Sequence, residues 1–86
     1  MIVVRDAGDD DLLVAPITTH PARVRYDVAL AEWRQAGLRL PSVAGVEKLA
    51  TVEKSAVLRR LGTCQSSDWA GVQRGLQDLW AEITAG

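Results

Sequence analysis

The chain has 86 residues, of which 48% are apolar, and its formal net charge is −1. A chain of this length forms one small domain, here residues 1–86, and its apolar content excludes a disordered protein. The small net charge excludes a general affinity for polyanions, so any nucleic-acid surface has to be a local cluster of Arg and Lys.

The first third of the chain is typical of β-strands. Residues 1–4, "MIVV", are a short apolar strand, and "RDAGDDD" after them is a turn in which Gly8 permits a positive φ. Residues 12–18, "LLVAPIT", are apolar on both faces, which predicts a buried strand. Residues 23–30, "RVRYDVAL", alternate between apolar and polar, which predicts a half-exposed strand with Arg23 and Arg25 on its polar face.

The middle of the chain is less regular. Residues 31–42 predict a loop with a helical turn, closed by Gly37 and Pro41. Residues 43–52 predict a further strand, in which Gly45 indicates a bulge or close packing. Residues 53–63 fit either a short helix or a strand, and Gly62 ends that element in both cases. The strands are therefore expected roughly within residues 1–62.

The clearest element is a helix over residues 67–84. Its apolar residues fall on one helical stripe: Trp69, Val72, Leu76, Leu79, Trp80 and Ile83. Two glycines inside the helix, Gly71 and Gly75, each cost about 1 kcal/mol relative to Ala. We therefore expect the helix to depend on docking its stripe, Trp80 included, onto the sheet. Trp33, in the loop, is the tryptophan expected to be exposed.

The order of these features is informative as a whole. "APITT" ends a strand, a polar strand follows, and then come "AGLRLPSV", "VEKLATVEKS", "LRRLGT" and the helix "SSDWAGVQRGLQDLW". This order resembles the MazF/PemK family of toxins from type II toxin–antitoxin systems, from Met1 to about Trp80. The resemblance implies an α+β fold: a mostly antiparallel, partial SH3-like β-barrel followed by a C-terminal amphipathic helix.

The resemblance also implies a function and partners. Family members are growth inhibitors that cleave single-stranded mRNA without a metal, form homodimers and bind an antitoxin protein. The expected activity is therefore that of a cytoplasmic endoribonuclease that needs no cofactor.

The beginning of the chain departs from the family pattern. A strand with a "GEIW"-like signature and an "RP" pair usually precede the strand that "MIVV" matches, and they carry the catalytic arginine and much of the RNA-binding loop. The chain starts at Met1 inside the matching strand, so the resemblance implies that this segment is lacking. Arg5 lies past the matching position. Weak or no RNA cleavage is therefore expected from the 86 residues alone, and activity from a chain extended by a family-like segment.

Thr18 matches the family's catalytic threonine in "PIT". RNA cleavage without a metal needs activation of the 2′-hydroxyl, a donor for the phosphorane charge and an acid for the leaving oxygen. Because a threonine hydroxyl is a poor base, its expected task is to donate to the scissile phosphate while an arginine carries the charge. From the residues alone, the simpler interpretation is that Thr18 and Thr19 end a strand and satisfy backbone groups of a turn.

The candidate RNA-binding residues follow the same resemblance: Thr19, Arg23, Arg25 and Ser42. The two arginines either bind phosphates or form a solvated face with weak ion pairs. The serine matches a serine of the family pattern, and it either binds RNA or caps a strand. His20 matches no catalytic position and is interpreted as a loop residue.

The remaining polar and reactive residues are interpreted as surface or structural residues. Lys54, Arg59 and Arg60 form a second basic cluster, which is typical of a solvated surface. The single cysteine, Cys64, is interpreted as a small buried apolar residue. With no Cys/His cluster in the sequence, it argues for a reducing cytoplasm and against a metal site. The longest apolar runs are about five residues, against about 20 for a membrane-spanning helix, so no membrane association is predicted.

Two other functions remain open at this stage. One is a truncated, catalytically inactive relative that only dimerises or binds an antitoxin peptide. The other is a small α+β interaction module unrelated to RNA.

Overall fold

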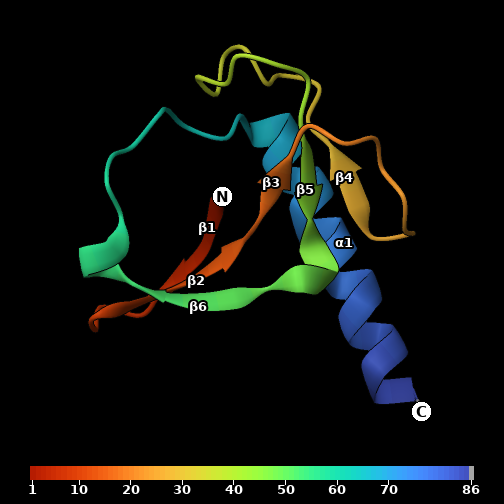
Figure 1. Cartoon of the computed structure of the whole chain (residues 1–86). Helices are drawn as coiled ribbons and strands as arrows, with labels where there is room; N and C mark the ends of the chain where they lie inside the picture. Colours follow the sequence, from red (N-terminus) through yellow and green to blue (C-terminus); the bar gives the residue numbers. More distant parts are fainter. Residues whose placement is uncertain (86) are drawn as a thin grey trace.

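A computed structural model describes residues 1–85 of the chain (Figure 1). In chain order the elements are β1 (Ile2–Asp6), β2 (Asp11–Ala15), β3 (Ile17–Thr18), β4 (Asp27–Ala29), β5 (Val43–Gly45), the 3-10 helix η1 (Val46–Lys48), β6 (Ala50–Glu53), the 3-10 helix η2 (Lys54–Ala56) and α1 (Ser66–Ala85). The predicted helix over 67–84 is confirmed to within one residue at each end.

The strands form two antiparallel three-stranded sheets. One sheet has the order β1-β2-β6, and the other has the order β3-β5-β4. The chain passes from the first sheet to the second through Pro16, between β2 and β3, and returns through η1, between β5 and β6. The predicted α+β fold with mostly antiparallel strands is thus confirmed. Within residues 1–85 the sheets do not close into a barrel, and each outer strand keeps one unpaired edge.

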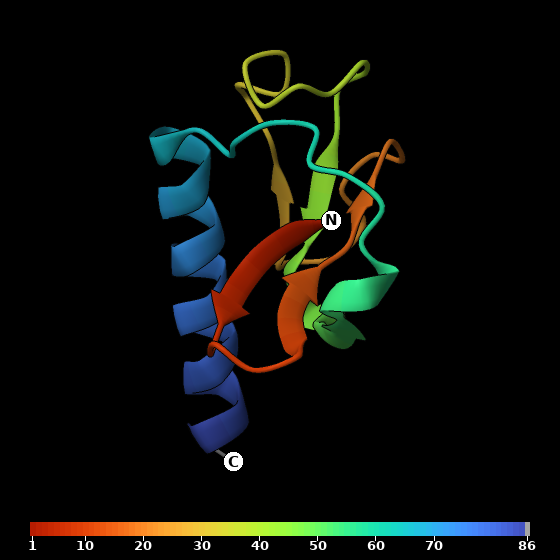
Figure 2. The same cartoon turned by 90° about the vertical axis from the view of Figure 1, so that its left-hand side faces the viewer.

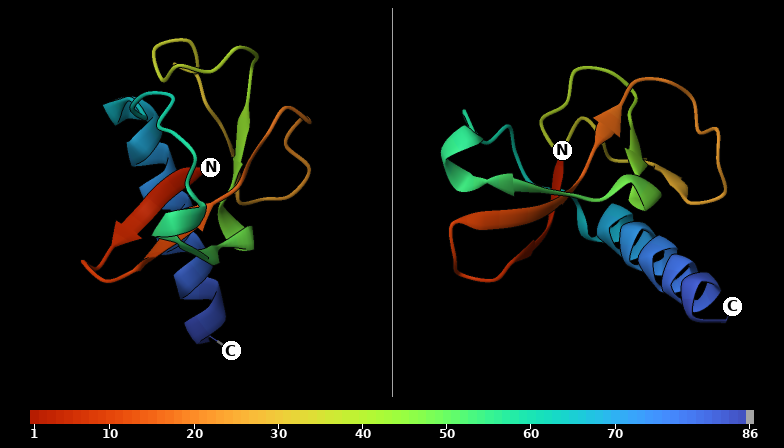
Figure 3. Two further views of the ribbon diagram at one scale, coloured as in Figure 1. Left: turned by 60° about the vertical axis from the view of Figure 1, so that its left-hand side comes forward. Right: turned by 60° about the horizontal axis from the view of Figure 1, so that its bottom comes forward.

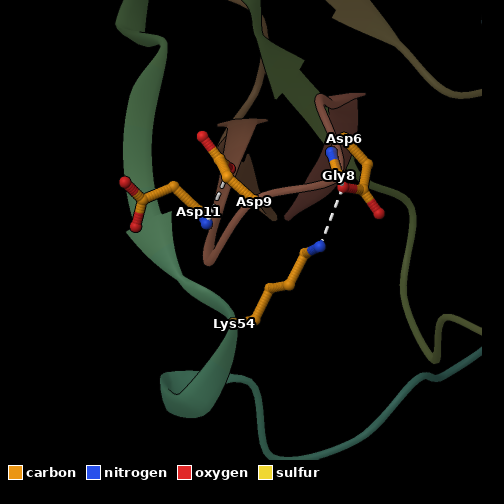
Figure 4. A network of polar contacts seen from close by, with 5 residues as sticks. All are labelled: Asp6, Gly8, Asp9, Asp11 and Lys54. Atoms are coloured by element: carbon orange, nitrogen blue, oxygen red, sulfur yellow. Dashed lines mark hydrogen bonds and ion pairs between the residues drawn. The ribbon is translucent and has the colours of Figure 1, made fainter.

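Short side chains of the β1–β2 hairpin fix its predicted turn (Figure 4). The Gly8 N–H donates to Asp6 Oδ1 at 2.9 Å, and the Asp11 N–H donates to Asp9 Oδ1 at 3.0 Å. Lys54, at the start of η2, contacts Asp6 Oδ1 at 2.9 Å, and this interaction lowers the pKa of the Asp6 carboxyl. Lys54 is therefore engaged at the hairpin, although the sequence grouped it with Arg59 and Arg60.

The predicted strand over residues 23–30 is wrong in its first half, because only Asp27–Ala29 form β4. Oδ2 of Asp27 accepts the N–H groups of Arg23, at 2.8 Å, and of Val24, at 3.3 Å. The Asp27 N–H in turn donates to the Val24 carbonyl at 3.1 Å. These bonds close residues 23–27 into a turn, so the backbone groups that a strand would present to a neighbour are already used.

Two further strand predictions need correction. The expected strand over 43–52 is divided into β5 and β6 by η1, at the point where the chain moves between the sheets. The segment over 53–63 forms only the short helix η2, and residues 57–65 after it have no regular structure. This segment crosses the molecule to the start of α1, as Figure 2 shows in teal and cyan.

Helix α1 packs along one side of the strands, against β4 and η1 (Figure 2). The core cluster between them consists of Ile2, Tyr26, Leu30, Ala44, Val46 and Val72. Gly71 and Gly75 face Val28, and a Cβ at Gly71 would lie 3.3 Å from Val28 Cγ1. The glycines that weaken the isolated helix thus let it approach β4 closely.

The two tryptophan expectations are reversed in the structure. Trp80 is 67% exposed and Ile83 is 63% exposed, because the last turns of α1 extend past the strands (Figure 3). Trp33 instead packs against the core cluster, and the Arg34 guanidinium covers its ring at 4.8 Å from the centroid. The apolar stripe of the helix is therefore longer than the surface that covers it.

Candidate functional site

Thr18 is the last residue of β3, and its side chain is half-buried. Its Oγ1 accepts the N–H of His20 at 3.2 Å, which begins the turn after the strand. A hydroxyl has one donor hydrogen and two acceptor lone pairs, so this bond leaves the O–H of Thr18 free to donate to a ligand. The geometry shows Thr18 as a turn residue, one of the two interpretations that the sequence left open, and its role toward a phosphate stays a prediction.

Thr19 and Ser42 lie at the same end of the β3-β5-β4 sheet as Thr18. The pairing of Thr18 with Val43 places Ser42, one residue before β5, beside the turn that begins at exposed Thr19. The side chain of Ser42 is buried, and its hydroxyl donates to the Leu40 carbonyl at 2.8 Å. This bond favours the strand-capping interpretation of Ser42.

Arg23 and Arg25 do not share the face of a strand, contrary to the sequence prediction. They lie in the turn before β4, and the Arg25 guanidinium covers the Tyr26 ring at 5.3 Å from its centroid. Thr18 is level with Ala29, the last residue of β4, because both pair with Val43. The strand pairing therefore places Thr18 at one end of this short sheet and the two arginines at the other.

Arg5 is also placed away from Thr18. It pairs with Leu13 in the first sheet, five residues before Thr18 along the chain. At about 3.3 Å per residue this separation is about 16 Å of chain, and it passes from the first sheet to the second at Pro16.

Three other residues of interest have local roles. His20 is exposed in the turn, as the sequence indicated. Cys64 is only half-buried, and desolvation by burial raises the pKa of its thiol. The Tyr26 hydroxyl donates to the Glu82 carboxylate, and this bond is the main cause of the raised pKa of Tyr26. The Tyr26–Glu82 contact fastens the turn before β4 to the last part of α1.

Asp68 is a structural anchor that sequence reasoning missed. In the sequence it is an acidic residue in the first turn of the helix, where it suits the positive end of the helix dipole. In the structure its carboxylate is 6% exposed and accepts two backbone N–H groups, from Ala31 at 2.9 Å and from Glu32 at 2.8 Å. These bonds attach the 31–37 loop to the first turn of α1. The acidic helix start was the available signal, but the sequence could not show which loop it binds.

The described residues lack two kinds of feature. No group of three or more His, Cys, Asp or Glu within residues 1–85 could hold a metal ion. None of the helices in that range has both the length and the apolar character that a membrane crossing requires.

The sequence was also compared with known protein families. A family model described as "PemK-like, MazF-like toxin of type II toxin-antitoxin system" matches residues 1–80. The chain belongs to this family. The resemblance noted from the order of motifs is thereby confirmed over almost the whole chain.

Two solved structures are similar to this chain. The Mycobacterium tuberculosis toxin MazF-mt6 is 19% identical, with a TM-score of 0.79 over 92% of this chain and 82% of that one. A second toxin, described as an Mtb toxin, is 20% identical, with a TM-score of 0.78 over 90% of this chain and 87% of the other. At such identities the likeness shows the shared fold alone. No curated protein sequence matches the chain significantly.

Proposed function

We propose that this MazF-like chain acts in the cytoplasm as a growth-inhibiting toxin that cleaves single-stranded mRNA without a metal. The observation that carries this proposal is the family match over residues 1–80, which includes the strand end that presents Thr18. An antitoxin protein is the expected inhibitor, and a homodimer is the expected active form.

The proposed reaction uses the RNA's own 2′-hydroxyl. That hydroxyl loses its proton and attacks the neighbouring phosphorus, the bond from phosphorus to the 5′-oxygen breaks, and the leaving oxygen takes up a proton. The products are a 2′,3′-cyclic phosphate and a free 5′-hydroxyl. The Thr18 O–H is available to donate to a phosphate oxygen on which negative charge develops.

Thr18 by itself does not supply the positive charge that this transition state favours. Arg5, Arg23 and Arg25 all lie away from Thr18 in the strand pairing. The source of the positive charge is tested by joining a family-like segment with its arginine before Met1 and comparing that arginine with these three.

A cleavage assay in the presence of a metal chelator tests the proposal. Single-stranded RNA is incubated with the 86-residue chain and with the same chain extended by a family-like "GEIW…RP" segment. We expect the extended form to cleave, and Thr18→Ala to lower its turnover by roughly 10²–10³, the usual cost of losing one donor to a developing oxyanion. His20→Ala, which changes the neighbouring exposed residue, is the matched control and should keep its activity.

The other results have defined meanings. Full activity of the Thr18→Ala variant would show that Thr18 is not the donor. Absence of cleavage by both forms would refute the endoribonuclease proposal and favour a relative that only binds an antitoxin. Strong cleavage by the 86-residue chain would place the required arginine within it, and glutamine variants of Arg5, Arg23 and Arg25 would identify it.

A further inference from the structure

Two glycines allow two distant segments to cross in close contact. A Cβ at Gly62 would overlap the carbonyl of Ala36, and a Cβ at Gly37 would overlap the carbonyl of Leu61. Gly37 also has a φ of +89°, a conformation that side-chain-bearing residues rarely adopt. The crossing therefore requires glycine on both segments, and it fixes the 31–40 loop against residues 59–63.

This crossing brings together arginines that are far apart in the sequence. A hollow of about 310 Å³ beside it is lined by Gly37, Leu38, Arg39, Arg59, Arg60 and Leu61. Three of its six lining residues are arginines, in a chain whose net charge is −1. The sequence had grouped Arg59 and Arg60 with Lys54, but Lys54 pairs with Asp6 at the hairpin.

The arginines of the hollow have unused donors. Arg60 donates from Nε to the Gly62 carbonyl at 3.1 Å and from an Nη to the Thr63 hydroxyl, which holds its side chain in place. No carboxylate within residues 1–85 lies in ion-pair distance of any of the three, and Arg39 and Arg59 donate no hydrogen bond within that range. Because each guanidinium carries five N–H donors in a planar fork, the hollow is suited to a phosphate group.

The hollow shares part of its lining with a second one. A larger, mainly apolar hollow of about 620 Å³ shares Leu38, Arg59, Arg60 and Leu61 with it, and it extends to Ile17, the residue before Thr18. Asp68 also lines the larger hollow, but its two carboxylate oxygens are occupied by the N–H groups of Ala31 and Glu32. Among residues 1–85, neither hollow therefore presents a free carboxylate that would repel a phosphate.

We infer that the hollow formed by Arg39, Arg59 and Arg60 binds backbone phosphates of single-stranded RNA away from the bond that is cut. The inference rests on the proposed function for its choice of RNA. A phosphate ligand is favoured over an acidic protein segment because the smaller hollow is mainly polar and three of its six lining residues are arginines, whose planar fork matches phosphate. Its contribution is electrostatic and independent of base sequence.

The test is the salt dependence of RNA binding by the 86-residue chain. The probe is a short single-stranded oligonucleotide with 2′-O-methyl groups throughout, which lacks the attacking hydroxyl and cannot be cleaved. We compare the double variant Arg39→Gln/Arg59→Gln with the double variant Lys48→Gln/Arg74→Gln, which removes the same charge from exposed positions outside the hollow. Arg60 is retained because its hydrogen bonds hold the segment.

The measured quantity is the salt slope, the slope of the logarithm of the binding constant against the logarithm of the salt concentration. We expect the first double variant to bind more weakly and to have a salt slope shallower by about 1.4, since each lost phosphate contact to single-stranded RNA removes about 0.7. The control should keep the slope of the unmodified chain. Arg39→Gln alone, which leaves residues 59–63 untouched, should show half the change, about 0.7. This single variant decides the question if the double variant does not fold, as judged by circular dichroism.

An unchanged slope, or an equal change in the control, would overturn the inference. Polyglutamate serves as a second probe, which represents an acidic protein segment. If the double variant Arg39→Gln/Arg59→Gln loses binding to polyglutamate but keeps the salt slope for RNA, the hollow binds an acidic protein segment instead. If cleavage of RNA depends on Thr18 but the salt slope of the double variant is unchanged, the proposed function stands and only this binding site is refuted. Absence of cleavage together with the expected slope change would refute only the proposed reaction.

Discussion

Two aspartates of this chain hold irregular segments in place by accepting backbone N–H groups. Asp27 accepts those of Arg23 and Val24, and Asp68 accepts those of Ala31 and Glu32. The Asp68 bonds are half-buried, where unpaired backbone donors are costly, whereas the exposed Asp27 bonds hold a turn. Single residues thereby decide where strands end in this small protein.

The Asp27 turn makes stability depend on pH in a defined direction. The backbone N–H of Arg23 is the main cause of a pKa below the ordinary 3.8 of this carboxyl. A lowered folded pKa contributes stability above the unfolded value, and the contribution is lost as the pH falls through the folded pKa. We expect Asp27→Asn to be less stable than the unmodified chain at neutral pH, with a difference that shrinks below pH 3.8. Urea unfolding at a series of pH values measures it.

Asp10→Asn is the control for that measurement, because the Asp10 side chain accepts no hydrogen bond within residues 1–85. A stability difference for Asp27→Asn that stays constant down to strongly acidic pH would contradict the role given to its carboxylate.

At the scale of elements, α1 packs on the core cluster as far as Leu79 and then exposes the apolar residues of its last turns. Val72 is fully buried against the core cluster, whereas Trp80 and Ile83 are mostly exposed. The hydrophobic effect is proportional to the apolar area removed from water, so the same stripe stabilises the fold only where strands lie beneath it.

Two truncations on the stripe should therefore differ in effect. Val72→Ala should lower the free energy of unfolding by about 2 kcal/mol, at roughly 0.8 kcal/mol per lost methyl plus a cavity term. Ile83→Ala removes more side chain, yet it should change stability by less than about 0.5 kcal/mol because it lies on the surface. Chemical denaturation of both variants measures the difference. Equal costs would mean that the end of the helix is covered in solution.

At the scale of the whole molecule, the sheets keep unpaired edges. β1 is an outer strand, and its residue Val3 is 47% exposed near Met1, which is 55% exposed. Proteins usually cover or charge such edges, because their free N–H and C=O groups pair readily with another chain. The edge of β1 is thus the place where we expect a second copy to associate, in line with the proposed homodimer.

A charge on that edge should weaken the association. We expect the unmodified chain to sediment as a dimer at high micromolar concentration and Val3→Lys to shift it toward monomer. Val24→Lys, which places the same charge on the exposed turn before β4, should leave the dimer intact. A well-folded monomer of the unmodified chain under these conditions would rule out association through β1.

The sequence by itself determined the features that local chemistry controls. The turn at Gly8 and the helix over residues 67–84 follow from backbone preferences and from periodicity, and the structure contains both. The single strand predicted over residues 12–18 is instead divided at Pro16 into β2 and β3, which belong to different sheets. The family also followed from the sequence, because the order of short motifs survives where no single motif is specific.

Only the tertiary structure decided which distant segments meet. The alternation over residues 23–30 failed because the side chain of Asp27 competes with a strand partner, a local bond that periodicity does not detect. Trp80 and Trp33 exchanged their expected places because burial depends on how far the sheet extends beneath the helix. Arg39 lies beside Arg59 and Arg60 because two glycines let the two segments cross closely. A contact between residues some 20 positions apart does not appear in the periodicity of the sequence.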